Sequence, residues 1–177
     1  MRFKQMNKTI DQMLNRPRIA LIFIAFISLC ALSFAYISEY FFGLQPCVLC
    51  IYQRVPFFIV LMIGFFGFVI HQNRICLLAL GLSALAFFVN TGIAVFHSGV
   101  ERKMWEGTDA CGGADISTMT SLADLKASIL AAPVSRCDEM PWDFLGLSMA
   151  NYNVIFCFIL GIYCLIALRN GLKNDTE

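Results

Sequence analysis

The sequence predicts an all-α integral membrane protein, a four-transmembrane-helix bundle with one long hydrophilic loop. Of its 177 residues, 59% are hydrophobic and only 14% are charged, whereas a soluble domain has about 25% charged residues. The apolar residues also gather in four runs, each long enough to cross a bilayer as a helix. No basic stripe or nucleic-acid-binding motif is present, so we expect the lipid bilayer and not nucleic acid as a partner.

The first predicted span covers residues 19–38 and follows a basic N-terminal segment. The basic side chains of this segment are Arg2, Lys4, Lys8, Arg16 and Arg18. A basic start before an apolar run is also typical of a signal peptide, with Ser33-Phe34-Ala35 as a candidate cleavage region. Because the run is longer than a usual signal sequence, we expect an uncleaved first helix.

The remaining spans are predicted at 47–70, 75–97 and 150–168. Pro46 suits the start of the second span, where its missing N–H is not needed, and Pro56 inside that span is tolerated in a membrane helix. The loop 98–147 is rich in acidic residues. Within this loop, Ser121–Ala131 shows the spacing of a short amphipathic helix, which either lies on the membrane surface or packs on the span ends. Trp142 and Phe144 are expected to act as interfacial anchors.

Lysine and arginine placement predicts the orientation. The N-terminal segment, the turn at Arg74 and the C-terminal Arg169 and Lys173 fall on one side of the four spans. By the positive-inside rule this side is cytoplasmic. In a bacterial inner membrane, the loop 98–147 and the start of the second span would then face the oxidising periplasm, where disulfides persist.

Eight cysteines divide into two sets. Four lie inside apolar runs and are expected to be packing residues: Cys30, Cys76, Cys157 and Cys164. The other four lie in or beside the loops: Cys47, Cys50, Cys111 and Cys137. Cys47 and Cys50 form a C-x-x-C pair, which can close a small disulfide or share a metal, and at a helix start it is more often a redox arrangement than a structural one.

Arg54 lies four residues after Cys50 and therefore on the same helix face. Cys50 is predicted in the first helical turn, where the unpaired N–H groups and the helix dipole favour a thiolate, and a neighbouring cation favours it further. The alternative is that Arg54 only extends toward lipid headgroups from a helix end.

Three features of the sequence together resemble the disulfide bond formation protein B (DsbB) family. They are the stretch Pro46-Cys47-Val48-Leu49-Cys50-Ile51-Tyr52-Gln53-Arg54, the second cysteine pair, and the stretch Trp142-Asp143-Phe144-Leu145-Gly146-Leu147. The resemblance covers roughly residues 17–168. It implies an inner-membrane, quinone-dependent thiol–disulfide oxidoreductase that reoxidises a periplasmic DsbA-type thiol oxidase and passes the electrons to ubiquinone or menaquinone.

The resemblance also implies roles for individual residues. Cys111 and Cys137 look like the disulfide that meets the partner oxidase, with Cys111 forming the mixed disulfide. Cys47 and Cys50 look like the pair that reoxidises this loop. The quinone-binding residues implied are Cys50, Arg54 and His97. For His97 the alternative is a histidine that merely lies at the membrane interface.

Three other functions fit the same residues. A paralogue of the DsbI type, serving a dedicated oxidase, would share every motif. A non-enzymatic scaffold would use the loop disulfides only for stability, for which Cys111–Cys137 would be worth about 3 kcal/mol. A zinc protein would use the four loop cysteines as thiolate ligands, although the second pair lacks C-x-x-C spacing and an oxidising compartment disfavours it.

Overall fold

The computed structural model describes residues 14–69, 72–108, 111, 121, 135–140 and 142–176. Within these residues four helices are long and apolar enough to cross a membrane. The helices are α2 (Pro17–Tyr40), α3 (Val48–Val69), α4 (Asn73–Glu101) and α6 (Met149–Thr176). The predicted all-α, four-span fold is therefore confirmed. Apart from Ser121, the predicted amphipathic helix at Ser121–Ala131 lies outside the described residues.

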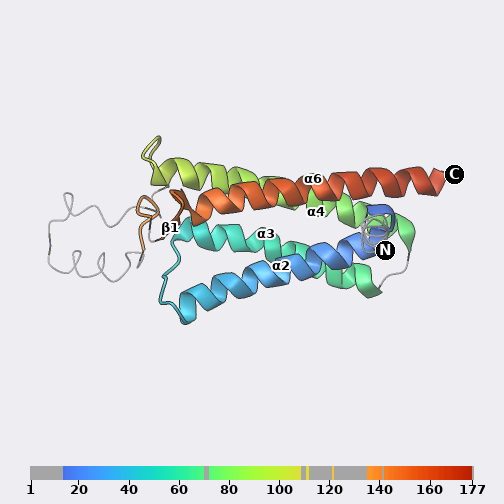
Figure 1. Cartoon of the computed structure of the whole chain (residues 1–177), viewed down its shortest axis with the longest axis horizontal. Coiled ribbons are helices and arrows are strands. Elements are labelled where there is room, and N and C mark those ends of the chain that lie inside the picture. The colour runs from blue at the N-terminus through green and yellow to red at the C-terminus, as the bar shows by residue number, and fades with distance from the viewer. Residues whose placement is uncertain are drawn as a thin grey trace.

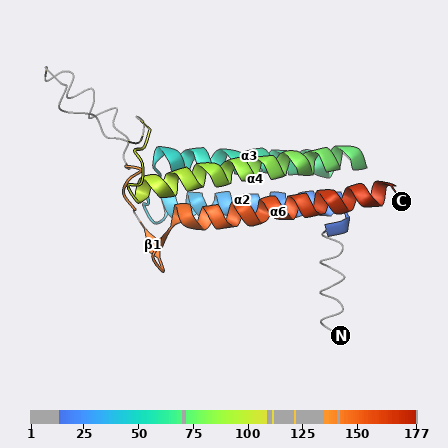
Figure 2. The ribbon, with the colours of Figure 1, turned by 90° about the horizontal axis from the view of Figure 1, so that it is seen from above.

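The four helices run alongside one another in two layers. Seen from above, α3 and α4 form one layer and α2 and α6 the other (Figure 2). The closest pairings are α4 with α6 and α2 with α3. The start of α2 and the end of α6 lie at one end of the bundle, while the end of α4 and the starts of α3 and α6 meet at the other, which we call the loop end (Figure 1).

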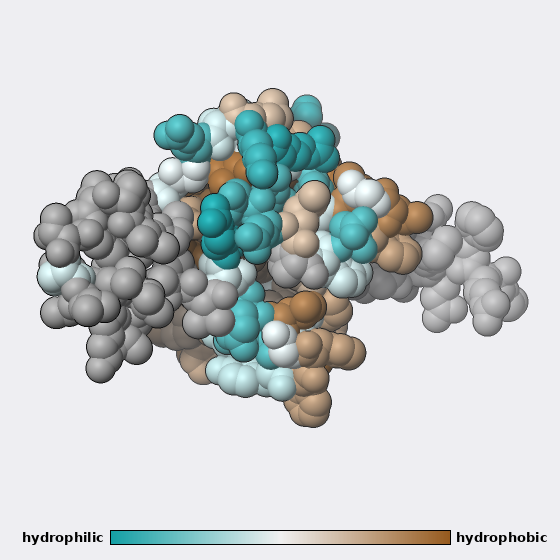
Figure 3. All heavy atoms as spheres, turned by 90° about the vertical axis from the view of Figure 1, so that its left-hand side faces the viewer, coloured by the Kyte–Doolittle hydropathy of each residue, from teal (hydrophilic) through white to brown (hydrophobic). Residues whose placement is uncertain are grey.

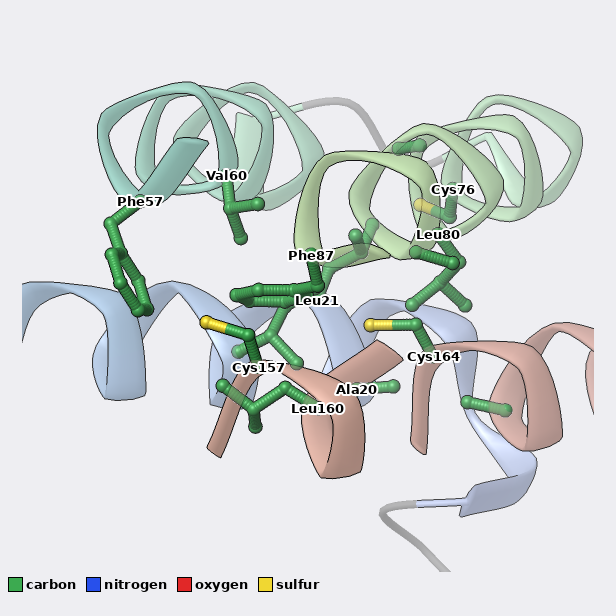
Figure 4. Close-up of a cluster of buried hydrophobic side chains, with 14 of the residues drawn as sticks. Ala20, Leu21, Phe57, Val60, Cys76, Leu80, Phe87, Cys157, Leu160 and Cys164 are labelled. Atoms are coloured by element: carbon green, nitrogen blue, oxygen red, sulfur yellow. The ribbon is translucent and has the colours of Figure 1, made fainter. Parts of the chain in front are cut away.

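Small and branched side chains fill the interior between the helices. Leu21, Val60, Leu80 and Phe87 are fully buried and meet in one cluster (Figure 4). Many large apolar side chains instead point outward, as expected for helices that face lipid. The bundle therefore presents apolar surface both inside and outside.

Gly64 sets the distance between α2 and α3. A Cβ placed on Gly64 would overlap the Cβ of Ala25 and lie 3.1 Å from the carbonyl oxygen of Leu21. Small residues allow membrane helices to approach closely, and van der Waals contact then stabilises the pair. Pro56 is accommodated inside α3, as predicted.

Two helices extend beyond the apolar spans that the sequence indicated. The helix α4 continues past residue 97 to Glu101, and α6 continues past residue 168 through Arg169 and Lys173. Consequently His97 lies inside the last turns of α4 and not at its end. This extension places Glu101, which is buried, one helical turn after the buried His97.

A short hairpin precedes α6, which the sequence analysis did not anticipate. Strand β1 (Asp143–Phe144) pairs antiparallel with β2 (Leu147–Ser148). The two turn residues, Leu145 and Gly146, both have positive φ angles, 54° and 73°, which is the pattern of a two-residue type I′ turn. The rings of Trp142 and Phe144 stack with centroids 6.1 Å apart. The hairpin carries Ser148 to the end of α4.

Candidate functional site

All four loop cysteines meet at the loop end of the bundle. Cys47, Cys111 and Cys137 are buried in one cluster, against which Cys50 packs. Hydrophilic side chains gather on this end of the molecule (Figure 3). The tertiary structure thus brings together two cysteine pairs whose nearest members, Cys50 and Cys111, lie 61 positions apart in sequence.

Cys47 and Cys50 lie where α3 begins. Their sulfur atoms are 3.3 Å apart as free thiols, and the backbone N–H of Cys50 points to Sγ of Cys47 at 3.4 Å. The hydrogen bond to Cys50 and burial raise the pKa of Cys47 from 9.0 to about 12. Cys47 is therefore held as the protonated partner and donates its S–H to Cys50.

Cys137 links the second pair to the first. Burial, followed by a hydrogen bond with Cys111, raises the pKa of Cys137 well above its ordinary value, while a hydrogen bond with the backbone of Leu49 opposes the shift. The contact with Leu49 places Cys137 against the first turn of α3. Because Leu49 lies between Cys47 and Cys50, the loop thiol is next to the C-x-x-C pair.

Cys111 is buried, with 4% of its surface exposed. Its sulfur lies 3.3 Å from Oγ1 of Thr108, and Gly107 packs against it so closely that a Cβ there would come within 2.8 Å of the Cys111 Cβ. In the described conformation the Cys111 sulfur therefore lies inside the cluster and not at the surface.

His97 stands between the cysteines and a set of polar side chains. Its Nε2 lies 3.4 Å from Sγ of Cys47 and 3.7 Å from Oε1 of Glu101. Its Nδ1 lies 2.8 Å from Nε2 of Gln53. Glu101 in turn accepts a very short hydrogen bond from the hydroxyl of Ser148. His97 is only 3% exposed, so these side chains form most of its surroundings.

Arg54 faces α2. Its Nη1 lies 2.6 Å from Oε2 of Glu39, and its guanidinium lies 4.8 Å from the centre of the Tyr36 ring. A pocket at the loop end is lined by Cys47, Cys50, His97, Glu101, Ser135, Arg136, Glu139, Trp142 and Met149. Arg136, which the sequence analysis did not single out, is thus a cation of this pocket, while Arg54 lies outside its lining.

The site also has the geometry for a metal ion. One ligand atom each from Cys47, Cys50 and His97 lie within 4.8 Å of one another. This group of two cysteines and one histidine, found among the described residues, differs from the zinc site of four cysteines considered from the sequence. A disulfide between Cys47 and Cys50 would remove both thiolates, so the oxidised pair offers no such site.

Sequence reasoning missed four polar residues that contact His97 directly or through one neighbour: Gln53, Glu101, Ser148 and Asn153. Gln53 and Asn153 lie within apolar helices. A polar residue inside a membrane span is a functional candidate by default. That signal was present in the sequence but could not reveal which partner each residue has.

The fold and the clustered thiols define a helical membrane protein with two cysteine pairs at one end. A family model described as "Disulfide bond formation protein DsbB" matches residues 17–167. The chain therefore belongs to the DsbB family, as the sequence resemblance suggested, and is a membrane protein of disulfide bond formation.

Two similar proteins carry the name of this family, and a third is uncharacterised. The chain is 31% identical to "Disulfide bond formation protein B" of Dechloromonas aromatica, over 71% of this chain and 77% of the relative. It is 28% identical to the protein of the same name from Xanthomonas euvesicatoria, over 82% and 87% of the two chains. An uncharacterised protein of Rickettsia prowazekii is 31% identical over 77% of this chain and 79% of its own.

Proposed function

We propose that this protein is a quinone-dependent thiol–disulfide oxidoreductase that reoxidises a periplasmic DsbA-type oxidase. The observation that carries the proposal is the position of Cys137, which lies against Leu49 between the two cysteines of the C-x-x-C pair. A protein that used its loop disulfide only for stability would not need this contact.

Electrons would leave the partner through two exchanges of thiol and disulfide. A partner thiolate attacks the Cys111–Cys137 disulfide, forming a mixed disulfide with Cys111 and releasing the Cys137 thiol. A second partner thiol completes the exchange, and the reduced loop then attacks the Cys47–Cys50 disulfide. Each exchange breaks one S–S bond and forms another, so two electrons and two protons arrive at Cys47 and Cys50.

A quinone, ubiquinone or menaquinone, would supply a lipid-soluble acceptor of two electrons and two protons. DsbA is itself a strong oxidant, at about −120 mV, so its oxidation needs an even stronger acceptor. The residues present fit such a molecule. Arg54 has N–H groups besides the Nη1 that Glu39 engages, and Ile51 and Val55 are 48% and 50% exposed beside it. We propose that Cys50, Arg54 and His97 hold the quinone.

The proposed orientation places the loop end in the periplasm and both chain termini in the cytoplasm of the bacterial inner membrane. The fold supports it because α2 begins, and α6 with Lys173 ends, at the opposite end from the cysteines (Figure 1). With this orientation, the spans bring an oxidant dissolved in the membrane to thiols that face water.

The test is to mix purified protein in detergent with a reduced DsbA-type oxidase and a soluble quinone, and to follow quinone absorbance and partner thiols. We expect matched consumption of the two, and none with Cys50→Ser. Consumption with another thiol protein but not with DsbA would indicate a paralogue of the DsbI type. No consumption with any thiol donor would leave the scaffold function, and loss of activity on chelation would indicate a metal protein.

A further inference from the structure

The two thiols of the C-x-x-C pair and the ring of His97 are spaced as ligands of a single metal ion. Sγ of Cys47 lies 3.3 Å from Sγ of Cys50 and 3.4 Å from Nε2 of His97, and all three atoms lie within 4.8 Å of one another. Around a tetrahedral zinc ion, two sulfur ligands are about 3.8 Å apart, and a sulfur and a nitrogen ligand are about 3.6 Å apart. Side-chain shifts of about 1 Å therefore suffice to close the three atoms around an ion.

Glu101 stands on the fourth side of this group. It lies one turn after His97 on α4, and its Oε1 is 3.7 Å from Nε2 of His97, whereas a nitrogen and an oxygen ligand of zinc are about 3.4 Å apart. Glu101 also lines the same pocket as His97, Cys47 and Cys50. Because residues four apart project from the same face of a helix, α4 presents an imidazole and a carboxylate together to the two sulfurs at the start of α3.

A second layer of side chains holds the imidazole and the carboxylate. The amide of Gln53 lies 2.8 Å from Nδ1 of His97, the ring nitrogen that does not face Cys47. With its oxygen turned to Nδ1, this amide accepts the Nδ1 proton and leaves Nε2 free to bind an ion. The hydroxyl of Ser148 donates a very short hydrogen bond to Oε2 of Glu101. Histidine and carboxylate ligands of metals are normally oriented by such hydrogen bonds.

We propose that the reduced protein binds one Zn²⁺ ion, or another divalent cation that accepts thiolates, with Cys47, Cys50 and His97 as ligands and Glu101 at the fourth position. Binding breaks two S–H bonds, forms two metal–sulfur bonds and releases two protons to water. No electron is transferred. The oxidised pair cannot bind the ion, because its disulfide leaves no thiolate, so the site exists in only one redox state.

The bound ion acts as a reversible inhibitor. This part of the inference rests on the proposed function, in which Cys47 and Cys50 must be free to form a disulfide. With both sulfurs bound to the ion, neither can attack the other, so a quinone cannot reoxidise the pair. A chelator that removes the ion returns both thiols unchanged. The metal therefore stops electron flow at one step without damage to the protein.

The test uses Co²⁺, which shows visible absorption bands in a tetrahedral site and a charge-transfer band when thiolates bind it. The full-length protein in detergent is reduced, freed of reductant without oxygen, and titrated with Co²⁺ and then with Zn²⁺. We expect one Co²⁺ per chain with two thiolate ligands, displacement of this Co²⁺ by Zn²⁺, and no thiolate band with the oxidised protein. Zn²⁺ should also block reoxidation of the reduced protein by quinone alone, and a chelator should restore it.

Substitutions identify the ligands of the ion. Gln53→Leu should weaken binding about 10- to 100-fold, the usual contribution of a residue that orients a ligand. His97→Ala and Cys50→Ser remove ligands and should weaken it by more than this. Glu101→Gln should weaken binding too, whereas Glu106→Gln is the matched control on an exposed residue and should bind as the wild type. Circular dichroism of each variant confirms that its helices are intact.

The loop pair provides a further control. The double variant Cys111→Ser/Cys137→Ser should bind Co²⁺ as the wild type does, because neither sulfur belongs to the proposed site. Loss of binding in this variant would overturn the proposal, since the ion would then be held by four thiolates.

Three other results would also overturn the inference. They are the absence of a thiolate band in the reduced protein, unchanged affinity in folded His97→Ala, and full reoxidation by quinone while Zn²⁺ stays bound. The Co²⁺ titrations need neither quinone nor partner. Normal Co²⁺ binding in a protein that oxidises no thiol would therefore contradict the proposed function and not the metal site.

Discussion

The sulfur of Cys47 lies 3.4 Å from Nε2 of His97, although fifty residues separate them in sequence. The contact joins the residue just before α3 to the last turns of α4, where Glu101 adds a carboxylate to the same ring. A buried thiol with a raised pKa needs a proton acceptor before it can act as a nucleophile. His97 is the residue of α4 that contacts this thiol.

The reactivity of Cys47 should depend on pH differently from that of an ordinary thiol. With a pKa of about 12, about one in a thousand Cys47 side chains is a thiolate at pH 9, against about three quarters for an ordinary cysteine with a pKa of about 8.5. In the reduced protein, alkylation of Cys47 should therefore rise about tenfold per pH unit with no plateau near pH 9. Peptide mass spectrometry over a pH series measures this rate.

The matched comparison is His97→Ala. The hydrogen bond with His97 lowers the pKa of Cys47, so its removal should slow alkylation further at every pH. Faster alkylation in His97→Ala would mean that the ring shields Cys47 more than it assists ionisation. A plateau near pH 9 in the unchanged protein would contradict the hydrogen bond to Cys50.

Arg54 should affect the quinone and not the partner. A hydrogen bond to a charged group contributes about 1.5–3 kcal/mol, so Arg54→Ala should raise the KM for quinone about 10- to 100-fold and leave the KM for the thiol partner unchanged. Arg54→Lys, which keeps the charge, should lose less. Steady-state kinetics with a soluble quinone measures both constants, and unchanged quinone kinetics in Arg54→Ala would remove this residue from the mechanism.

Glu39 provides a second test of the role of Arg54. Because Oε2 of Glu39 engages Nη1 of Arg54 at 2.6 Å, Glu39→Gln should free the guanidinium. The substitution should then change the KM for quinone when residue 54 is arginine, but not in the Arg54→Ala variant. A double-mutant cycle of Glu39→Gln and Arg54→Ala checks the coupling. Additive effects would show that the ion pair is not linked to quinone binding.

Cys111→Ser should separate the two halves of the reaction. The variant should lose oxidation of the partner, because the first disulfide cannot form, while Cys47 and Cys50 remain oxidisable by quinone. Thiol trapping followed by mass spectrometry measures each pair. Cys30→Ser is the control, since Cys30 is exposed on α2, and should behave as the wild type. Continued partner turnover in Cys111→Ser would contradict the relay between pairs.

Gly64→Ala should destabilise the bundle. A Cβ at this position overlaps Ala25 of α2, and forcing a methyl group into packed helices costs about 1–3 kcal/mol, which outweighs the gain of about 1 kcal/mol in helix propensity. Gly92→Ala is the control, because a Cβ there meets nothing within 4 Å. Thermal unfolding in detergent should give a lower Tm for Gly64→Ala and an unchanged or higher Tm for Gly92→Ala.

The helices could be predicted because a membrane span is a local property of the sequence. Apolar runs of the length of a bilayer define α2, α3, α4 and α6 with little help from their neighbours. The hairpin at 143–148 could not be predicted, since its turn needs a positive φ at Leu145, a conformation that leucine rarely adopts. The stretch after Cys137 therefore looked like a loop.

The sequence by itself determined the four spans and singled out the four loop cysteines that we propose as the reactive thiols, because hydropathy and the C-x-x-C spacing are local features of the chain. Only the tertiary structure decided which side chains meet these thiols. Gln53 and Asn153, 100 residues apart, share a hydrogen bond, and Arg54 pairs with Glu39 of a different helix. These partners are set by which buried polar groups lie within hydrogen-bond distance once the helices have packed, because a buried polar group needs a hydrogen-bond partner. No local sequence pattern specifies which two groups will meet.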